Sequence, residues 1–182
     1  EYILADNMKF LSNQKYREIR FIWSNDFFHF DTPSQTTTAG TPQDSDLRQK
    51  KMSLIGKEML VDAITNLSII APVKTIWTPS NHDNMISYET NLYLDAWFKK
   101  DKSVTINTEC YDRQYDPFGE TLIGYAHGDG MKPEKLMSLM LIEAKEHWSN
   151  CKYYEFHVGH LHSEKLKENN DNGIMIRYVA SP

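Results

Sequence analysis

The chain has 182 residues, of which 40% are hydrophobic and 25% are charged, and this size and balance predict one soluble globular domain over residues 1–182. Its formal net charge of −5 argues against a protein that coats nucleic acid non-specifically, although a local basic groove stays compatible with it. No apolar run approaches the roughly 18 residues of a membrane span. The two cysteines, Cys110 and Cys151, have neither metal-finger nor disulfide-scaffold spacing, which favours reduced thiols and a cytoplasmic location.

Hydrophobic spacing alternates along the chain between a strand period and a helix period. A short helix is expected at 8–17, and a Thr-, Ser-, Gly- and Pro-rich stretch at about 32–45 predicts a long loop or flexible lid. Strands are predicted at 19–23, 73–77, 104–106, 121–125, 153–158 and 174–179, and longer helices at 52–67, 88–98 and 133–148. Strands that alternate with helices predict an α/β layered domain.

Polar clusters follow four of the predicted strands. They are Asp26, the triplet Asn81-His82-Asp83, His127, and the pair His160 and His162 in Gly-His-Leu-His. In α/β sheets, ligand-binding groups gather on the loops beyond the carboxyl ends of the strands. The coincidence of four such clusters is a stronger indication of a site than any one of them.

The clusters offer oxygen and nitrogen ligands for a divalent metal. Asp26 has a carboxylate that can bridge two cations, Asn81 has an amide oxygen, and His127, His160 and His162 have imidazole nitrogens. This set suits Mn, Fe, Zn or Ni and lacks the thiolates of a structural zinc site. Each residue alone has an ordinary alternative as a turn cap, a turn residue or a surface histidine, and only their occurrence in one series favours a site.

The ordered series resembles the calcineurin-like metallophosphoesterase superfamily. The family pattern is Asp-x-His, Gly-Asp-x-x-(Asp/Asn/His), Gly-Asn-His-(Asp/Glu), a lone His and Gly-His-x-His, in that order. The form Asp26-Phe27-Phe28-His29, with Thr32-Pro33-Ser34 soon after, is most similar to the double-strand-break repair exonuclease branch. The resemblance spans about residues 20–165 and implies a layered fold, a β-sandwich flanked by helices.

The resemblance implies a site for two divalent cations, most readily Mn²⁺, with Fe, Zn, Ni and Mg as alternatives. By family roles, Asp26 bridges the two ions, Asn81, His127 and His160 complete one ion's ligand set, and His162 belongs to the other. The first family motif, Asp-x-His, is absent from this sequence, and Asp6 has no histidine two places on. We expect that motif and its strand upstream of Glu1, so the second ion's set is incomplete in this chain, which is expected to be N-terminally truncated. Ser24-Asn25 and Ser80 also stand where the family pattern usually has glycines, before Asp26 and before Asn81.

The same resemblance implies the catalytic roles. His82 contacts the phosphate and protonates the leaving oxygen, and Asp83 orients its ring. His29 is expected near the substrate, with a packing role as an equal alternative. The expected function is metal-dependent hydrolysis of phosphodiesters, of the DNA-exonuclease kind. The alternatives are a catalytically weak metal-binding subunit that keeps the fold for protein or nucleic-acid contacts, or a phosphodiesterase for small esters. The oligomeric state is open.

Overall fold

The computed structural model describes residues 15–24, 26–46, 48–129, 132–160, 165–169 and 173–179. The chain divides into two compact units. Unit 1 comprises Glu1–Trp77 and Asn81–Cys110, and unit 2 comprises Thr78–Ser80 and Tyr111–Pro182. The single domain predicted over residues 1–182 stays a prediction.

Unit 1 contains a three-stranded sheet with the strand order β1-β2-β3. Its strands are β1 (Ile19–Ser24), β2 (Val73–Thr78) and β3 (Val104–Thr105). β2 and β3 run parallel, with Val73 opposite Val104. The two longer strands have the β-branched and aromatic composition that suits a pleated sheet, IRFIWS in β1 and VKTIWT in β2.

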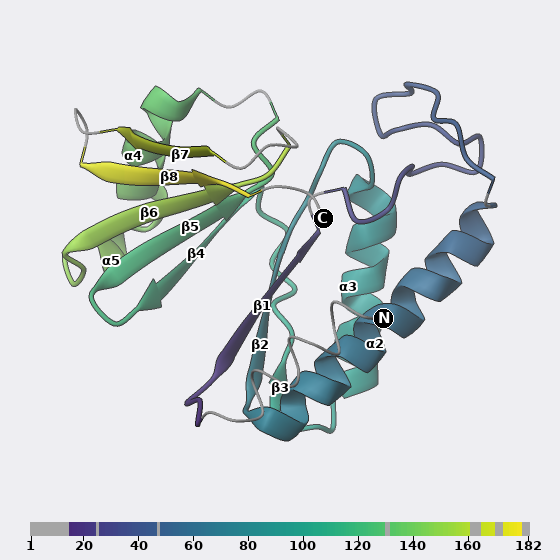
Figure 1. The fold of residues 1–182 in the computed structure, drawn as a ribbon, viewed down its shortest axis with the longest axis horizontal. Coiled ribbons are helices and arrows are strands. Elements are labelled where there is room, and N and C mark those ends of the chain that lie inside the picture. Colours follow the sequence, from purple (N-terminus) through teal and green to yellow (C-terminus); the bar gives the residue numbers. More distant parts are fainter. Residues whose placement is uncertain are drawn as a thin grey trace. The chain divides into compact units, whose positions relative to one another are not determined.

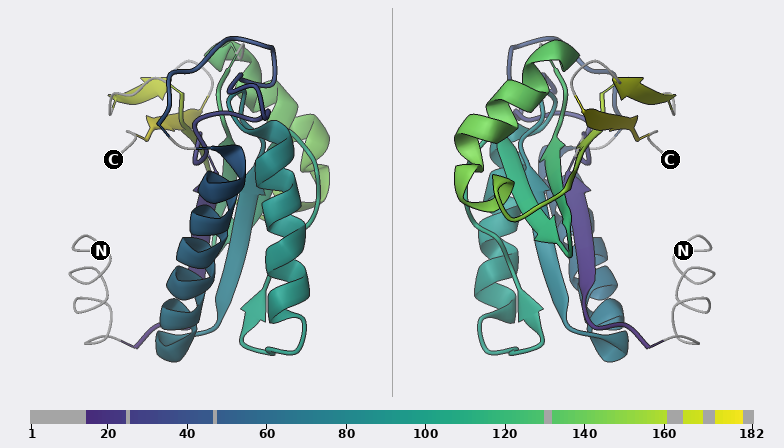
Figure 2. Two further views of the ribbon diagram at one scale, coloured as in Figure 1. Left: turned by 90° about the vertical axis from the view of Figure 1, so that its right-hand side faces the viewer. Right: turned by 90° about the vertical axis from the view of Figure 1, so that its left-hand side faces the viewer.

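Two helices cover one face of this sheet. α2 (Gln49–Ile70) and α3 (Asn84–Phe98) lie side by side against the strands, as the two views of Figure 2 show. The buried residues of α2 recur every three or four positions, which is the spacing of one helix face: Met52, Gly56, Leu60, Ala63, Ile64 and Leu67. Leu60, Ile64 and Leu67 of this face form a core with Trp23, Val73, Trp77, Leu94 and Phe98 of the strands and α3. Met52 packs in a second cluster with Phe28, Phe30 and Ile86. Burial of this face is the main source of the helices' stability.

Unit 2 contains a five-stranded sheet with the strand order β4-β5-β6-β8-β7 (Figure 1). Its strands are β4 (Arg113–Phe118), β5 (Thr121–Ala126), β6 (Tyr153–Val158), β7 (Lys165–Asn169) and β8 (Ile174–Tyr178). The central strands β5, β6 and β8 are parallel to one another, and the two edge strands, β4 and β7, are antiparallel to their neighbours. The parallel pair β5 and β6 needs a crossover, which the helices supply.

The crossover consists of α4 (Pro133–Glu143) and α5 (Lys145–Trp148), which lie on one face of the sheet (Figure 1). Pro133 opens α4 at a position where its missing N–H costs nothing. The core of unit 2 joins Leu136 and Met140 of α4 to Leu122, Phe156 and Ile176 of the strands. This packing fixes the ends of β5 and β6, from which two predicted ligands follow.

Most predicted elements are confirmed, with four differences. The helix predicted at 133–148 is interrupted at Ala144, whose backbone (φ −112°, ψ 33°) is not helical. α3 begins at Asn84, four residues before the predicted position. The strands β4 and β7 were not predicted. Both are edge strands, and an edge tolerates the proline at position 117 and the charged sequence KLKEN.

The fold class is mixed α/β with two sheets and four helices in the part of the chain that the structure describes. No helix among these residues is long and apolar enough to cross a membrane. The helix expected at 8–17 falls mostly outside the described residues.

Candidate functional site

Asp26 lies in unit 1, directly after β1, in an uncommon backbone conformation. Its φ is +65°, in the left-handed region. A side chain in this region costs about 1–2 kcal/mol, although aspartate enters it more readily than most residues. The side chain is half-buried. Asn25, the preceding residue of the motif, lies outside the described residues.

The triplet Asn81-His82-Asp83 connects β2 to α3, also in unit 1. The ring nitrogen Nδ1 of His82 lies 3.0 Å from the carbonyl oxygen of His29. A carbonyl oxygen only accepts hydrogen bonds, so Nδ1 carries the proton in this contact. Nε2 of His82 is then the nitrogen that can take up or release a proton. This is the arrangement that an acid or base catalyst needs.

Asp83 is fully buried, and its Oδ2 accepts a hydrogen bond of 2.7 Å from the backbone N–H of Phe28. The bond spans 55 positions of the sequence and ties the loop after β1 to the start of α3. The contact that the structure describes for the His82 ring is therefore with the His29 backbone, while Asp83 holds the backbone next to it. The predicted role of Asp83 in orienting that ring stays a prediction.

His29 has an exposed ring whose Nε2 donates toward the carbonyl oxygen of Asp44 at 3.1 Å. Its ring centroid lies 5.9 Å from that of His82. The structure thus brings His29 and His82 together. Nothing in these contacts distinguishes the predicted substrate role of His29 from a packing role.

His127 and His160 come together in unit 2 because of the register of two parallel strands. Ala126, the last residue of β5, lies opposite Val158, the last residue of β6. The histidines follow these positions, and His160 Nδ1 lies 3.2 Å from His127 Nε2. His127 is buried and His160 is half-buried. The predicted pairing of these two histidines is therefore present in the structure.

The spacing of the two rings fits a shared divalent cation. Two imidazoles that bind one ion at about 2.1 Å have nitrogens about 3.0 Å apart at a right angle and about 3.4 Å apart at the tetrahedral angle. The observed 3.2 Å lies inside this interval. Without an ion, the same distance is a hydrogen bond in which one nitrogen donates and the other accepts.

The backbone around this pair is strained, as it is at Asp26. His160 has a φ of +66°, so two of the three non-glycine residues with positive φ in the described chain are predicted ligands; the third is Gln35. Strained residues of this kind cluster at functional sites. Gly128, next to His127, has a φ of +104°, and a Cβ there would lie 3.4 Å from the Cβ of Val158. Glycine therefore suits this turn.

One carboxylate lies near the pair, and a separate charged cluster lies on β6 and β8 of the same unit. Asp129 Oδ1 lies 3.9 Å from His160 Nε2, the nitrogen that faces away from His127. On β6, His157 Nε2 lies 2.6 Å from Glu155 Oε1, which also accepts a hydrogen bond from Arg177 Nε. Burial alone would raise the pKa of Glu155, but the hydrogen bonds from Arg177 and His157 outweigh it and lower that pKa. His157 is therefore engaged with Glu155.

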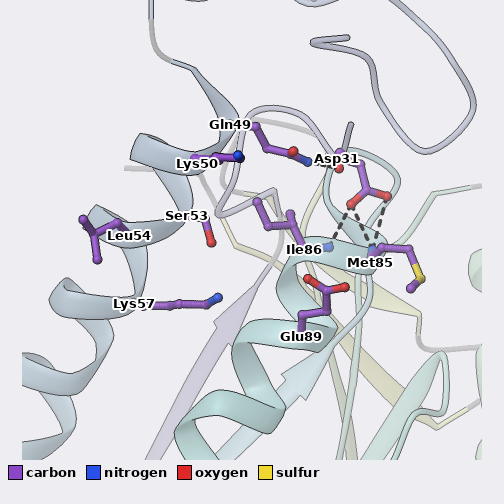
Figure 3. A pocket seen from close by; sticks show the side chains of 9 residues that line it. All are labelled: Asp31, Gln49, Lys50, Ser53, Leu54, Lys57, Met85, Ile86 and Glu89. Atoms are coloured by element: carbon purple, nitrogen blue, oxygen red, sulfur yellow. Dashed lines mark hydrogen bonds between the residues drawn. The ribbon is translucent and has the colours of Figure 1, made fainter. Parts of the chain in front are cut away.

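A groove of about 480 Å³ lies between the first turns of α2 and α3 in unit 1 (Figure 3). Lys50 and Lys57 line it together with two carboxylates, Asp31 and Glu89. Asp31 already accepts hydrogen bonds from the backbone of α3. The mixed charges give no electrostatic reason to place a polyanion in this groove.

The sequence predictions and the structure meet at particular contacts within each unit. The His82 ring contacts the His29 carbonyl, the Asp83 carboxylate accepts the N–H of Phe28, and the His127 ring contacts the His160 ring. His162 lies outside the described residues. Sequence reasoning missed Asp31, which caps α3 from more than 50 positions upstream, because no helix begins near it in the sequence.

The comparisons with known proteins add no relative. The chain matches no protein-family model and no curated protein sequence. Membership of the metallophosphoesterase superfamily therefore stays a prediction from the motifs.

Proposed function

We propose that this chain is a metal-dependent phosphodiesterase that binds a divalent cation through His127 and His160 and uses His82 as a proton donor. The observation that carries the proposal is the pair of imidazole nitrogens 3.2 Å apart, held by a strained backbone at His160. The mixed α/β composition with two sheets is compatible with the layered metallophosphoesterase-type fold, which belongs to the proposal.

The wider ligand set comes from the order of the motifs in the sequence alone. It adds Asp26 and Asn81 to the cation of His127 and His160, and assigns His162 to a second ion. These oxygen and nitrogen donors suit Mn²⁺, with Fe, Zn, Ni and Mg as alternatives. A bound divalent cation supplies positive charge toward the phosphate and activates the attacking water.

His82 supplies the acid chemistry in this proposal. Its Nδ1–H is held on the His29 carbonyl, so that in the doubly protonated ring Nε2–H is left to pass its proton to the leaving oxygen, which returns the ring to the neutral Nδ1–H form. General-acid catalysis of this kind accelerates such steps about 10²–10⁴-fold. His29, whose ring neighbours His82, would contact the phosphodiester.

The first test measures metal binding without any substrate. Mn²⁺ is titrated into the wild type, His127→Ala and His160→Ala by calorimetry, with His147→Ala as the matched control, since His147 is an exposed histidine of α5 in the same unit. We expect both site variants to lose at least about tenfold in affinity, because each removes one of the imidazole ligands. Equal affinity in all four proteins would refute the metal site.

The second test measures hydrolysis. With Mn²⁺, the wild type should cleave bis(p-nitrophenyl) phosphate, and His82→Ala should lose turnover while it keeps its affinity for Mn²⁺. Equal, negligible hydrolysis by both proteins, together with intact metal binding, would favour the metal-binding subunit over the enzyme. Linear single- and double-stranded DNA are then tested as substrates under the same conditions. Cleavage of the ester without cleavage of DNA would remove the nuclease assignment and keep the phosphodiesterase.

A further inference from the structure

Asp31 caps a helix that begins far from it in the sequence. Its carboxylate accepts hydrogen bonds from the backbone N–H groups of Met85 at 3.0 Å and Ile86 at 2.8 Å, in the first turn of α3 (Figure 3). Asp31 is buried, with 8% of its surface exposed. Its backbone oxygen accepts a bond from the Gln49 amide at the start of α2. One residue thus holds the beginnings of α2 and α3.

α3 draws this cap from outside because its own N-terminal residues do not supply one. Asp83, at the N-cap position, makes no side-chain cap hydrogen bond, and the first turn contains no acidic residue. The carboxylate of Asp83 instead accepts the N–H of Phe28. Each segment therefore supplies a carboxylate to the other. Asp31 accepts N–H groups at the start of α3, and Asp83 accepts an N–H group of the loop after β1. A negative charge at a helix N-terminus also interacts favourably with the helix dipole.

Thr38 links Asp31 to the backbone before and after His82. Its hydroxyl donates to Asp31 Oδ2 at 2.9 Å, and its backbone N–H donates to the carbonyl oxygen of Asn81 at 3.2 Å. The same hydroxyl accepts the N–H of Asn84 at 3.4 Å. The backbone is therefore held immediately before His82, through Asn81, and shortly after it, from Asn84 to Ile86.

We propose that Asp31 and Thr38 are positioning residues for His82, a role that rests on the proposed part of His82 in phosphodiester hydrolysis. They fix the backbone on both sides of His82, so that its Nδ1–H stays on the His29 carbonyl and its Nε2 faces the substrate. Neither residue touches the His82 ring in the contacts described, so each acts through the backbone.

The test reads the ring of His82 directly. Long-range ¹H–¹⁵N correlation spectra of the metal-free protein without substrate report which nitrogen of neutral His82 carries the proton. We compare wild type, Thr38→Val and Asp31→Asn with Thr38→Ser, which keeps the hydroxyl. Ile64→Val is the control, because it weakens the buried core of α2 in the same unit without touching the loop.

Wild type, Thr38→Ser and Ile64→Val should show the Nδ1–H form. Thr38→Val and Asp31→Asn should show a mixture of both forms, and the amides of Met85 and Ile86 should exchange with solvent about tenfold faster in Asp31→Asn. If these two variants lose stability but keep the wild-type proton position, as Ile64→Val does, the residues are merely structural and the proposal is wrong. If Asp31→Asn does not fold, the comparison of Thr38→Val with Thr38→Ser still tests whether the Thr38 hydroxyl positions His82.

The kinetics of ester hydrolysis give a second test of the positioning role, separate from the measurement of the His82 proton. With bis(p-nitrophenyl) phosphate, Thr38→Val should lower kcat and leave KM near the wild-type value, because the misplaced group is a proton donor and not a binding group. An inactive wild type would contradict the proposed function. The proton position of His82 would still test whether Asp31 and Thr38 position its ring. An unchanged kcat in Thr38→Val beside an active wild type would contradict the positioning role.

Discussion

The two units hold their candidate residues by different means. In unit 1, His82 and its neighbours depend on side-chain hydrogen bonds from residues more than 40 positions away, such as Asp83 to Phe28 and Asp31 to Ile86. In unit 2, His127 and His160 are brought together by the backbone register of β5 and β6. Strand register is a cooperative property of a whole sheet, whereas a single carboxylate can be deleted by one substitution.

This difference indicates how each half of the candidate site should respond to mutation. Unit 1 should lose the geometry of His82 when one buried polar group is removed. Unit 2 should keep the histidine pair until packing within the sheet itself is disturbed.

The largest effect is expected from two glycines that face aromatic rings. A Cβ at Gly124 of β5 would lie 2.5 Å from the ring of Phe156, and a Cβ at Gly56 of α2 would lie 2.3 Å from the ring of Phe28. Overpacking should cost about 2–3 kcal/mol in Gly124→Ala. Gly56→Ala should cost less, because alanine in a helix recovers about 1 kcal/mol. Urea unfolding measures both.

The matched controls for these two variants relieve the clash. Phe156→Leu combined with Gly124→Ala, and Phe28→Leu combined with Gly56→Ala, should each be more stable than the sum of their single effects predicts. Strict additivity in both pairs would show that the rings are not the cause of the loss.

The buried carboxylate of Asp83 gives the next largest effect. Asp83→Ala leaves the Phe28 amide without its acceptor and should cost about 1–3 kcal/mol. Hydrogen exchange should report faster exchange at the Phe28 amide and no change at β6 of unit 2. Asp83→Asn, whose amide oxygen still accepts, should lose less. If alanine and asparagine cost the same, the hydrogen bond to Phe28 contributes nothing.

The smallest effect is expected at the charged pair that ties β4 to α4 in unit 2. Arg113 donates to both carboxylate oxygens of Glu143 at 2.7 and 2.6 Å, and the Tyr115 hydroxyl donates at 2.6 Å. The hydrogen bond from Arg113 lowers the pKa of Glu143. A partly exposed pair of this kind is worth about 1 kcal/mol, so Glu143→Gln should cost about that much at pH 7.

The pH dependence of this effect has a definite sign. Because the pKa of Glu143 is lower in the folded protein, its contribution is present above the unfolded value of about 4.3 and is lost as the pH falls through the folded value. The stability difference between wild type and Glu143→Gln should therefore shrink on acidification below about pH 4. A difference that grows on acidification would contradict the assigned role of the pair.

The sequence predicted the elements with strong hydrophobic periodicity and missed those at the edges. α2 followed from apolar residues at helical spacing, and Met52, Ala63 and Leu67 of that pattern are buried. Of the same pattern, Ile55 and Met59 are exposed, because periodicity alone does not tell which side of a broad apolar stripe meets the core. β4 escaped prediction because Pro117 is typical of a loop unless the strand lies at an edge.

The sequence predicted which polar residues follow the strands of the candidate site. It did not predict the long-range hydrogen bonds that hold them. The resemblance implied that His127 and His160 belong to one ion's ligand set, and the register of β5 and β6 brings their ring nitrogens to 3.2 Å from each other. The contacts of Asp31 and Thr38 with residues 81–86 were not predictable, because these partners lie 43 to 55 positions away and depend on how the loop folds back onto α3. A long-range cap has no local sequence pattern.

The central claim is that His127 and His160 share a divalent cation. The most direct measurement is the anomalous scattering of crystals grown with saturating Mn²⁺, recorded near the manganese absorption edge. We expect one anomalous peak within bonding distance of both His127 Nε2 and His160 Nδ1, and its loss in His160→Ala. A peak elsewhere, or well-ordered histidines joined by a hydrogen bond with no peak between them, would contradict it.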